Sequence, residues 1–354
     1  MNNININCPI NGTGYGSVSL NIVKALDALG LDVSLFLMGQ ATVNTEQDAE
    51  LMRKLLEKAK TFQYKAPFLK IWHQWDLAHH IGRGRYYAFP FFEIDTLNST
   101  EKHHLNYTDT VFVASEWAKQ ILKQNDIKVP VVVAPLGVNT TVFNYIPKIK
   151  IQNNYVFFHI GKWEHRKAQD FLLKAFEAAF TDTDSVELWL LPDNPFLSEQ
   201  ELKYWENLVN TNHLSSKIRI CPRLNTQYDV AQVMANADCG VFVSRAEGWN
   251  NEILESMAMN KPVIVTNYSG HTEFCTKDNS FLVDIDELEP ANDGKWFHGT
   301  GKWAKLSQPQ FTQTVEYMRW AYENTVYSNK AGLATAQKYS WNRTASIINK
   351  TIGY

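Results

Sequence analysis

Residues 237–270 read ADCGVFVSRAEGWNNEILESMAMNKPVIVTNYSG, and this stretch decides the fold of the second half of the chain. The apolar run at 239–243 predicts a buried strand, and the amphipathic run at 252–259 predicts a helix after a polar loop. A Lys-Pro pair ends the helix, and the apolar run at 263–266 predicts the next strand. The stretch is therefore one strand–loop–helix–strand unit.

Among the acids in the loop and the helix of this unit, Glu247 and Glu255 are eight residues apart. An eight-residue step returns to nearly the same helix face, since two turns take ~7.2 residues. Glu247 precedes the helix, however, so we expect the two carboxylates at different depths. Carboxylates accept hydrogen bonds from sugar and ribose hydroxyls, and the free amides of a helix start favour phosphate. The residues expected at that helix start are Gly248, Trp249, Asn250 and Asn251. A chance pair of acids is the alternative, which the surrounding strand and helix make less attractive.

The composition narrows the class of protein. The chain has 354 residues, more than one hydrophobic core usually holds, so two domains are expected. The net charge of −3 disfavours nucleic acid, and no apolar run approaches the ~18 residues that span a bilayer. The four cysteines lie far apart, with no zinc spacing. These features predict a cytoplasmic protein with at most peripheral membrane contact. The 11 tryptophans suit carbohydrate stacking or a large core.

The chain opens with an expected strand at 4–8, a glycine-rich turn at 11–16, a helix from Val18 and a strand at 31–37. Such a βαβ unit can present backbone N–H groups to an anion at the helix start. The turn adds three donor-binding candidates: Gly14, Tyr15 and Gly16. A tight turn that needs glycine for its backbone angles explains the same residues equally well.

The glycine-rich turn does not match the dinucleotide-binding fingerprint. With Gly14 and Gly16 as its first two glycines, the third would fall at Ser19. The end of the second strand, at 36–40, also lacks the acid that would bind a ribose. An NAD site is therefore disfavoured.

Further apolar runs predict strands at 69–75, 85–93, 110–115 and 129–137, alternating with helices, and hence a parallel sheet. Ligands of such sheets bind at the carboxyl ends of the strands. The polar residues expected at those ends are His73, Glu93 and Ser115. The first two are our acceptor-side candidates, although each residue could equally be a solvated loop residue.

The polar stretch 144–154 is the expected linker between domains. It gives a first domain of 1–147 and a second of 148–337, with a terminal helix at about 338–354. Within the second domain, 287–306 is rich in loop-forming residues and predicts an irregular loop, whereas 311–329 predicts a helix.

A basic loop follows the first expected strand of the second domain, 155–160. It presents Lys162, Arg166 and Lys167, three cations within six residues, before a helix. Such a loop suits a diphosphate, although a solvated basic loop is an equal alternative. Arg223, after a strand expected at 218–221, is a further donor-side candidate.

These motifs resemble those of the retaining family 4 glycosyltransferases, also called glycosyl transferases group 1. Residues 247–258 and 261–264 resemble the family's motif of two acids separated by seven residues. The basic loop is similar to the family's, with Lys162 where arginine is more usual and Lys167 as the expected lysine. The parts of the chain that resemble its glycine loop, domain-closing strand and final helix are 12–16, 135–143 and 340–345.

The resemblance implies the α/β GT-B fold, in which two Rossmann-like domains with parallel sheets face a cleft and the C-terminal helix crosses back to the first domain. It implies a UDP- or GDP-sugar donor on the second domain, with no cofactor and no metal. Lys162 and Lys167 would neutralise the leaving diphosphate, Glu247 would hold the donor sugar and Glu255 the ribose. The acceptor would attack from the first domain, with retention of the anomeric configuration.

The sequence departs from the family pattern at two places. The family often has a histidine after a strand of the first domain, where this chain has FPFFE at 89–93. Either Glu93 takes that place or the acceptor is handled differently. Ala168 stands where the basic loop of the family usually has glycine.

Other functions remain open at this stage. A sugar-nucleotide epimerase could share this fold and donor, and a glycosyltransferase could act on a modified nucleic-acid base instead of a glycan or lipid-linked sugar. A carbohydrate- or nucleotide-binding protein on a retired scaffold is the non-enzyme alternative, against which the intact basic loop and both acids argue.

Overall fold

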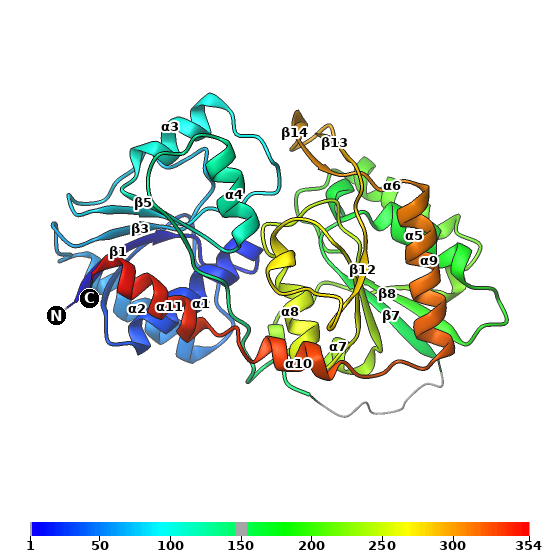
Figure 1. Cartoon of the computed structure of the whole chain (residues 1–354). Coiled ribbons are helices and arrows are strands. Elements are labelled where there is room, and N and C mark those ends of the chain that lie inside the picture. The colour runs from blue at the N-terminus through cyan, green and yellow to red at the C-terminus, as the bar shows by residue number, and fades with distance from the viewer. Residues whose placement is uncertain (1, 146–153, 354) are drawn as a thin grey trace. The chain divides into compact units, whose positions relative to one another are not determined.

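The computed structural model describes residues 2–145 and 154–353. The chain forms two compact units, one made of Met1–Val138 with Tyr339–Tyr354 and the other of Asn139–Lys338 (Figure 1). The expected linker at 144–154, with the boundary at residue 147, falls mostly outside the described residues.

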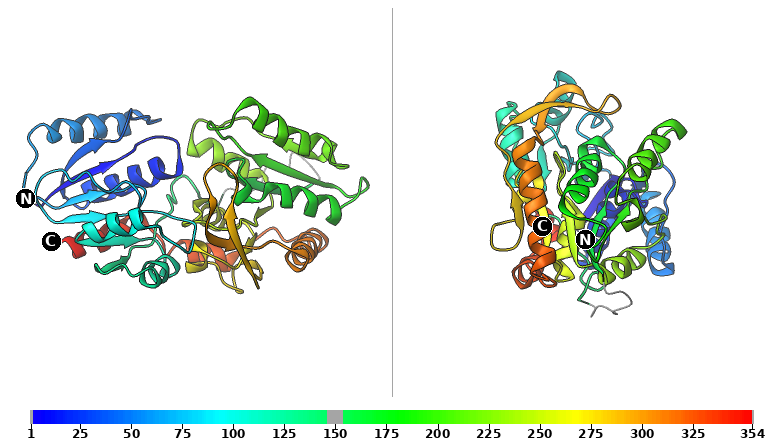
Figure 2. Two further views of the ribbon diagram at one scale, coloured as in Figure 1. Left: turned by 90° about the horizontal axis from the view of Figure 1, so that it is seen from above. Right: turned by 90° about the vertical axis from the view of Figure 1, so that its right-hand side faces the viewer.

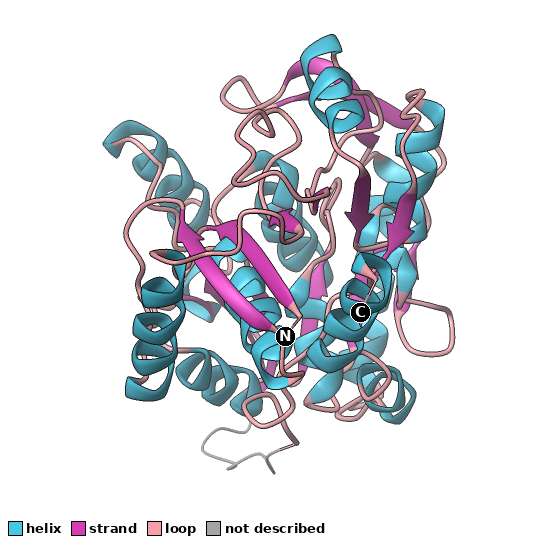
Figure 3. Ribbon diagram, turned by 90° about the vertical axis from the view of Figure 1, so that its left-hand side faces the viewer, coloured by secondary structure: helices cyan, strands magenta, loops and turns pink. Residues whose placement is uncertain are grey.

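The first unit contains a six-stranded parallel sheet in the order β2-β1-β3-β4-β5-β6. Its strands are β1 (Asn3–Cys8), β2 (Asp32–Leu37), β3 (Phe68–Lys70), β4 (Tyr86–Ala88), β5 (Thr110–Val113) and β6 (Val131–Val133). Its helices are α1 (Gly14–Ala28), α2 (Glu46–Ala59), α3 (Ser99–Tyr107), α4 (Glu116–Gln124) and α11 (Trp341–Ile352). Figure 3 shows these helices packed around the strands. The C-terminal helix α11 packs against α1, and the Thr344 hydroxyl donates to the Pro135 carbonyl at 2.6 Å.

The glycine-rich turn is part of a helix. The predicted helix begins at Val18, but α1 begins at Gly14, because the Thr13 hydroxyl accepts a hydrogen bond from the Gly16 amide. A Cβ on Gly16 would lie 2.3 Å from the Asn11 side chain, whereas a Cβ on Gly14 would meet nothing within 4 Å. Close packing, and not a positive φ, is therefore what requires glycine at residue 16.

Several predicted strands of the first unit are too long, and of the one expected at 129–137 only β6, Val131–Val133, is a strand. The structure ends β3 at Lys70 and β4 at Ala88, so His73 and Glu93 lie in loops beyond the strands and not at their last residues. The chain in both places turns away from the sheet, next to Pro90 in the second case, and a proline cannot donate to a ladder. The helix α3, held by a capping box between Asn98 and Glu101, was not predicted.

The second unit repeats the parallel architecture in the order β12-β11-β10-β7-β8-β9. Its main strands are β7 (Tyr155–Ile160), β8 (Val186–Leu191), β9 (Ile218–Ile220), β10 (Cys239–Phe242), β11 (Val263–Thr266) and β12 (Phe281–Val283). Its helices are α5 (Gln169–Ala179), α6 (Glu199–Asn210), α7 (Gln227–Asn236), α8 (Asn251–Ala258), α9 (Gln308–Glu323) and α10 (Lys330–Ala336). No helix in the described ranges is long and apolar enough to cross a bilayer.

The strand–loop–helix–strand prediction for residues 237–270 is confirmed by β10, α8 and β11. The buried Lys261 ammonium, just after α8, donates to the carbonyls of Ala235 and Ala237 at 2.9 and 2.7 Å. These carbonyls end α7, where a cation offsets the helix dipole. The side chain at the turn thus fixes α7 relative to β11.

Two predictions for the end of the second unit are wrong. Residues 287–306 are not an irregular loop, because β13 (Leu288–Asn292) and β14 (His298–Ala304) form an antiparallel hairpin outside the main sheet (Figure 2). Its register shifts between Pro290 and Asn292, which breaks the alternation that would reveal a strand. The single helix expected at 311–329 ends at Glu323, and α10 is a separate helix packed on α8.

Candidate active site

Side-chain contacts hold the loop between β7 and α5 in one shape. The Gln169 side-chain amide donates through Nε2 to the carbonyls of Gly161 and Lys162 at 2.9 and 2.7 Å. Trp163 is buried and stacks on Trp205 of α6, with ring centroids 5.0 Å apart and an interplanar angle of 10°. Ala168 has a left-handed backbone with φ of 57°, which explains why glycine is usual at this position in the family it resembles.

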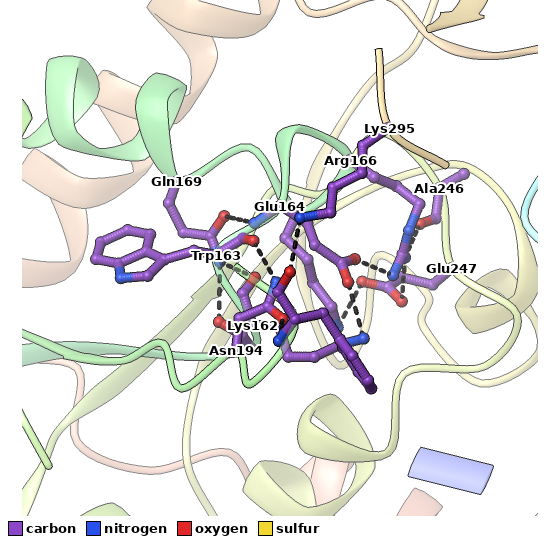
Figure 4. Close-up of polar contacts among 12 residues, drawn as sticks. Lys162, Trp163, Glu164, Arg166, Gln169, Asn194, Ala246, Glu247 and Lys295 are labelled. Carbon is purple, nitrogen blue, oxygen red and sulfur yellow. Dashed lines mark hydrogen bonds and ion pairs between the residues drawn. The ribbon is translucent and has the colours of Figure 1, made fainter. Parts of the chain in front are cut away.

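Glu247 binds the two buried cations of this loop. Its Oε2 accepts from Arg166 Nη1 at 2.9 Å (Figure 4). Its Oε1 lies 3.0 Å from Lys167 Nζ. Arg166 and Lys167 are each 7% exposed and Glu247 is 5% exposed. Arg166 and Glu247 are 81 residues apart in the chain but meet because β7 and β10 are neighbours in the sheet.

Glu164 and Lys162 continue this group of charges from Arg166 toward the surface. Glu164 accepts from Arg166 Nη2 at 2.8 Å through Oε2, and its Oε1 lies 2.8 Å from Lys162 Nζ. We call Lys162, Glu164, Arg166, Lys167 and Glu247 the charge cluster. It alternates in sign and holds three cations against two anions. One positive charge is therefore left over, at a site whose most exposed member is Lys162.

The buried charges of the cluster stay ionised. Burial alone would raise the pKa of Glu247, but the adjacent Lys167 and Arg166 outweigh it and lower that pKa to about 2. Burial opposes the charge of Lys167 as well, yet Glu247 and Glu252 raise its pKa above the ordinary value. The pair is therefore a fixed ion pair at neutral pH and not a proton donor and acceptor.

Two buried histidines flank the charge cluster in their neutral form. The ring of His159, at the end of β7, bonds the Val241 carbonyl through Nδ1 at 2.7 Å, and burial lowers its pKa to about 4. His271 bonds the Thr266 carbonyl through Nε2 at 2.6 Å, and burial lowers its pKa too. The second ring nitrogen of each, His159 Nε2 and His271 Nδ1, has no partner among the described residues. Each is thus a buried acceptor for a hydroxyl or amide.

The loop that carries Glu247 is locked to the turn after β11. The Glu247 amide donates to the Ser269 hydroxyl at 2.8 Å, and the Gly270 amide donates to the Glu247 carbonyl at 2.9 Å. A Cβ on Gly270 would lie 2.2 Å from the Gly248 carbonyl oxygen. Only glycine lets these two backbone segments approach so closely. Glycine at residue 270 is therefore needed to hold the backbone of Glu247 in this position.

Polar side chains at the start of α8 lack hydrogen-bond partners among the described residues. Asn250 precedes the helix with φ of 73°, and its side chain makes no capping bond to the helix amides. Two buried amide oxygens, those of Asn250 and Asn251, have no partner in the described part of the chain. Trp249 differs from its neighbours, because its ring is buried against Phe274 with centroids 4.8 Å apart. Its side chain supports the loop from the core.

Glu255, one turn into α8, has a different environment from Glu247. Burial, with a smaller contribution from Glu252, raises the pKa of Glu255 well above its usual range. Its carboxyl has no hydrogen bond or ion pair with any residue in 2–145 or 154–353. A ligand that donated hydroxyl hydrogen bonds here would supply the partners the carboxyl lacks.

The hairpin braces the charge cluster through Arg245. The Arg245 amide donates to the Arg166 carbonyl at 2.7 Å, and its guanidinium lies 3.2 Å from Glu289 of β13. The Ala304 amide of β14 donates to the Arg245 carbonyl at 2.9 Å. The hairpin that the sequence did not predict is therefore bonded to the site. Arg223, in contrast, forms an exposed pair with Asp193.

The sequence candidates of the first unit lie around Tyr15. Its ring lies 4.5 Å from that of His73, and its hydroxyl accepts from the Phe91 amide at 2.8 Å. Burial, with the nearby Glu93 charge, raises the pKa of Tyr15 well above its usual range. Gly14 is exposed at the start of α1. The first unit thus brings Tyr15, His73 and Glu93 together.

The part of the chain that holds the charge cluster is similar to known proteins. Residues 154–292 match the family model described as glycosyl transferases group 1. The matched residues run from β7 to β13 and include the whole charge cluster. An uncharacterized glycosyltransferase of Methanocaldococcus jannaschii is 22% identical over 175 residues, which are 47% of this chain and 41% of that relative. The match therefore spans less than half the length of the relative.

Solved structures share the fold over nearly the whole chain. Sucrose-phosphate synthase from Thermosynechococcus elongatus has a TM-score of 0.74 at 15% identity, covering 99% of this chain and 98% of that one. Anabaena HepE in complex with UDP-glucose has a TM-score of 0.71 at 17% identity, with the same coverage of 99% and 98%. The chain has the GT-B glycosyltransferase fold, as the sequence resemblance implied. At these identities the likeness shows the fold alone.

Proposed function

We propose that this chain is a retaining glycosyltransferase that moves a sugar from a nucleotide-diphosphate sugar to a hydroxyl acceptor. The observation that carries the proposal is the charge cluster, with its surplus positive charge, inside the region that matches the group 1 glycosyltransferase model. A diphosphate is an anion of the matching sign. HepE, which shares the fold, forms a complex with UDP-glucose, which supports a UDP- or GDP-sugar as the donor.

The cations act on the leaving group. The bond between the anomeric carbon and the diphosphate oxygen breaks, and its electron pair leaves with the diphosphate. The acceptor oxygen bonds the anomeric carbon on the same face, and its proton passes to the departing diphosphate. Lys167 and Lys162 neutralise the charge that develops there, and Arg166 is added to them because it shares Glu247 with Lys167. Because side chains supply this positive charge, we expect turnover without an added metal ion.

The two acids hold hydroxyls. Glu247 is ionised and rigid, so it can accept hydrogen bonds from the donor sugar without moving a proton. Glu255 binds the ribose, whose hydroxyls satisfy a partly buried carboxyl that has no partner in the described chain. The amides at the start of α8, from Gly248 to Asn251, point their helix dipole at the phosphates. Gly14, Gly16 and Arg223 are kept as donor-side candidates.

A panel of UDP- and GDP-sugars tests the proposal, with release of nucleoside diphosphate and product structure as readouts. We expect one donor to be consumed, and consumption to fail in Lys167→Ala and Glu247→Ala. Lys203→Ala is the matched control, because Lys203 makes an exposed pair with Glu199 on α6 of the same unit. Undiminished turnover in both site variants would refute the assignment of the site.

The same panel separates the alternatives. A sugar-nucleotide epimerase would change the donor without any acceptor present. A glycosyltransferase of nucleic acids would need a base-containing acceptor. A protein that only binds would be stabilised by a donor, by an amount that grows with its concentration, and would release no nucleoside diphosphate.

A further inference from the structure

A cluster of aromatic rings lies beyond the carboxyl ends of β1, β3 and β4 in the first unit. The Tyr15 ring lies 5.2 Å from Trp72, 4.5 Å from His73 and 5.0 Å from Phe91. Trp75 stacks on His73, with centroids 5.3 Å apart and an interplanar angle of 15°. We call these five rings the aromatic platform. Tyr15 lies in the first turn of α1, and the other four rings come from the loops after β3 and β4, at the edge of the sheet where ligands of parallel sheets bind.

Hydrogen bonds and an ion pair hold the rings of the aromatic platform in place. The Tyr15 hydroxyl both accepts from the Phe91 amide at 2.8 Å and donates to the Phe91 carbonyl at 3.0 Å, which ties α1 to the loop after β4. The Asp76 amide donates to the His73 carbonyl at 3.1 Å, so a tight turn presents Trp75. The fully buried Lys70 ammonium, at the end of β3, lies 3.7 Å from the Asp76 carboxylate and anchors that turn.

Trp75 is the most exposed ring of the aromatic platform. Its side chain is 50% exposed although its ring is stacked on His73, and Trp72, His73, Tyr15 and Phe91 are partly buried beneath or beside it. A half-exposed indole that is braced by a second ring loses little conformational freedom when it binds. A flat apolar face of this kind fits the C–H face of a pyranose ring.

The charges around the platform decide between kinds of ligand. Glu93 is near enough to Tyr15 to perturb its hydroxyl, and Asp76 follows Trp75 directly in the chain. Carboxylates accept hydrogen bonds from sugar hydroxyls but repel phosphate. Lys70, at the end of β3, is buried and paired with Asp76, so its charge is not available to a ligand phosphate. A phosphate-rich ligand such as a nucleic acid or an anionic lipid surface fits these charges poorly.

We propose that the aromatic platform binds a neutral carbohydrate, with Trp75 stacking on a sugar ring and Glu93 accepting its hydroxyls. If the proposed transferase function holds, on which this identification of the ligand as acceptor rests, the acceptor is a glycan or a sugar-terminated molecule. The function alone does not specify this class, because a lipid hydroxyl, a protein side chain and a nucleic-acid base are also acceptors.

Tryptophan fluorescence and saturation-transfer NMR test the proposal on the full chain. The probes are neutral oligosaccharides ending in glucose, galactose or N-acetylglucosamine, a single-stranded DNA oligomer and phosphatidylglycerol vesicles. We expect at least one oligosaccharide to bind and Trp75→Ala to weaken that binding by about 10-fold, whereas Trp75→Tyr should retain most of it. Trp320→Ala is the matched control, because Trp320 of α9 is 49% exposed and belongs to the second unit.

The outcomes distinguish this proposal from the proposed function when UDP and GDP binding are measured on the same samples. Nucleotide binding without oligosaccharide binding overturns the carbohydrate platform and leaves the donor site standing. Oligosaccharide binding that depends on Trp75, without any nucleotide binding, supports the platform and counts against the transferase. Oligosaccharide binding that Trp75→Ala leaves unchanged in a folded variant overturns the platform, and so does DNA or vesicle binding that is lost in that variant.

Discussion

Replacing Glu247 by glutamine should destabilise the second unit although the side-chain volume is kept. The change removes the anion shared by Arg166 and Lys167, which are both buried. Breaking one side of a buried ion pair costs about 3–5 kcal/mol, because the remaining charge stays buried without compensation. Arg166 keeps Glu164, at 2.8 Å, so we expect the lower end, about 3 kcal/mol. For a unit of this size that lowers Tm by about 6–12 °C.

Urea unfolding and thermal melts of the full chain measure this effect. The double variant Glu247→Gln with Lys167→Met should recover part of the loss, since removing both partners of a buried pair is milder than removing one. Glu46→Gln is the matched control and should be nearly neutral, because its pair with Arg53 is exposed on both sides. Saturating UDP should stabilise Glu247→Gln more than the wild type, because the diphosphate replaces the missing negative charge. The reasoning is refuted if Glu247→Gln has the same Tm as the wild type. It is also refuted if the double variant is less stable than Glu247→Gln by as much as Lys167→Met alone destabilises the wild type.

Three further predictions concern residues that hold the charge cluster in place. As the pH falls from about 6.5 to 4, the free energy of unfolding should drop by up to roughly 3 kcal/mol, because the pKa of buried His159 is about 4 and the unfolded chain takes up the proton first. Urea titrations across this range should show a shallower slope in His159→Gln, and an equal slope would contradict the assignment. Gly270→Ala should cost about 1–3 kcal/mol in the same assay because of its clash with the backbone, whereas Gly14→Ala, with open space around it, should cost nothing; similar effects of both would contradict this. Glu289→Gln, which loosens Arg245, should lower kcat more than it changes KM in a nucleotide-release assay, and an unaltered kcat would show that the hairpin does not position the basic loop.

The parts of the fold that follow from local patterns could be predicted from the sequence. The continuous apolar runs at 239–243 and 263–266 are typical of strands buried on both faces, and the helix after Glu247 has helical spacing of its apolar residues. The hairpin at 288–304 could not be recognised, since proline, glycine and a register shift disturb its alternation. The lengths of β3 and β4 were overestimated because aromatic residues continue past the strands into the platform.

The candidate site was predicted in its parts but not in its connections. The basic loop and the acid at 247 were both identified, yet nothing local shows that Arg166 reaches across 81 residues to Glu247, because that contact depends on β7 and β10 being neighbours. Lys162 was given the same weight as Lys167, but its side chain is 40% exposed and pairs with Glu164. Trp249 was counted as a binding residue from its position, whereas its ring fills a gap against Phe274.

The most direct test of the proposed function is an NMR time course with the donor identified by the panel and an acceptor sugar. The anomeric proton of the transferred sugar is followed in the wild type and in Lys167→Ala. We predict that nucleoside diphosphate and glycoside appear together, that the new linkage keeps the anomeric configuration of the donor, and that both signals are lost in Lys167→Ala. Inversion of the anomeric centre would contradict the retaining reaction, and transfer that persists in the folded Lys167→Ala variant would contradict the role of the charge cluster.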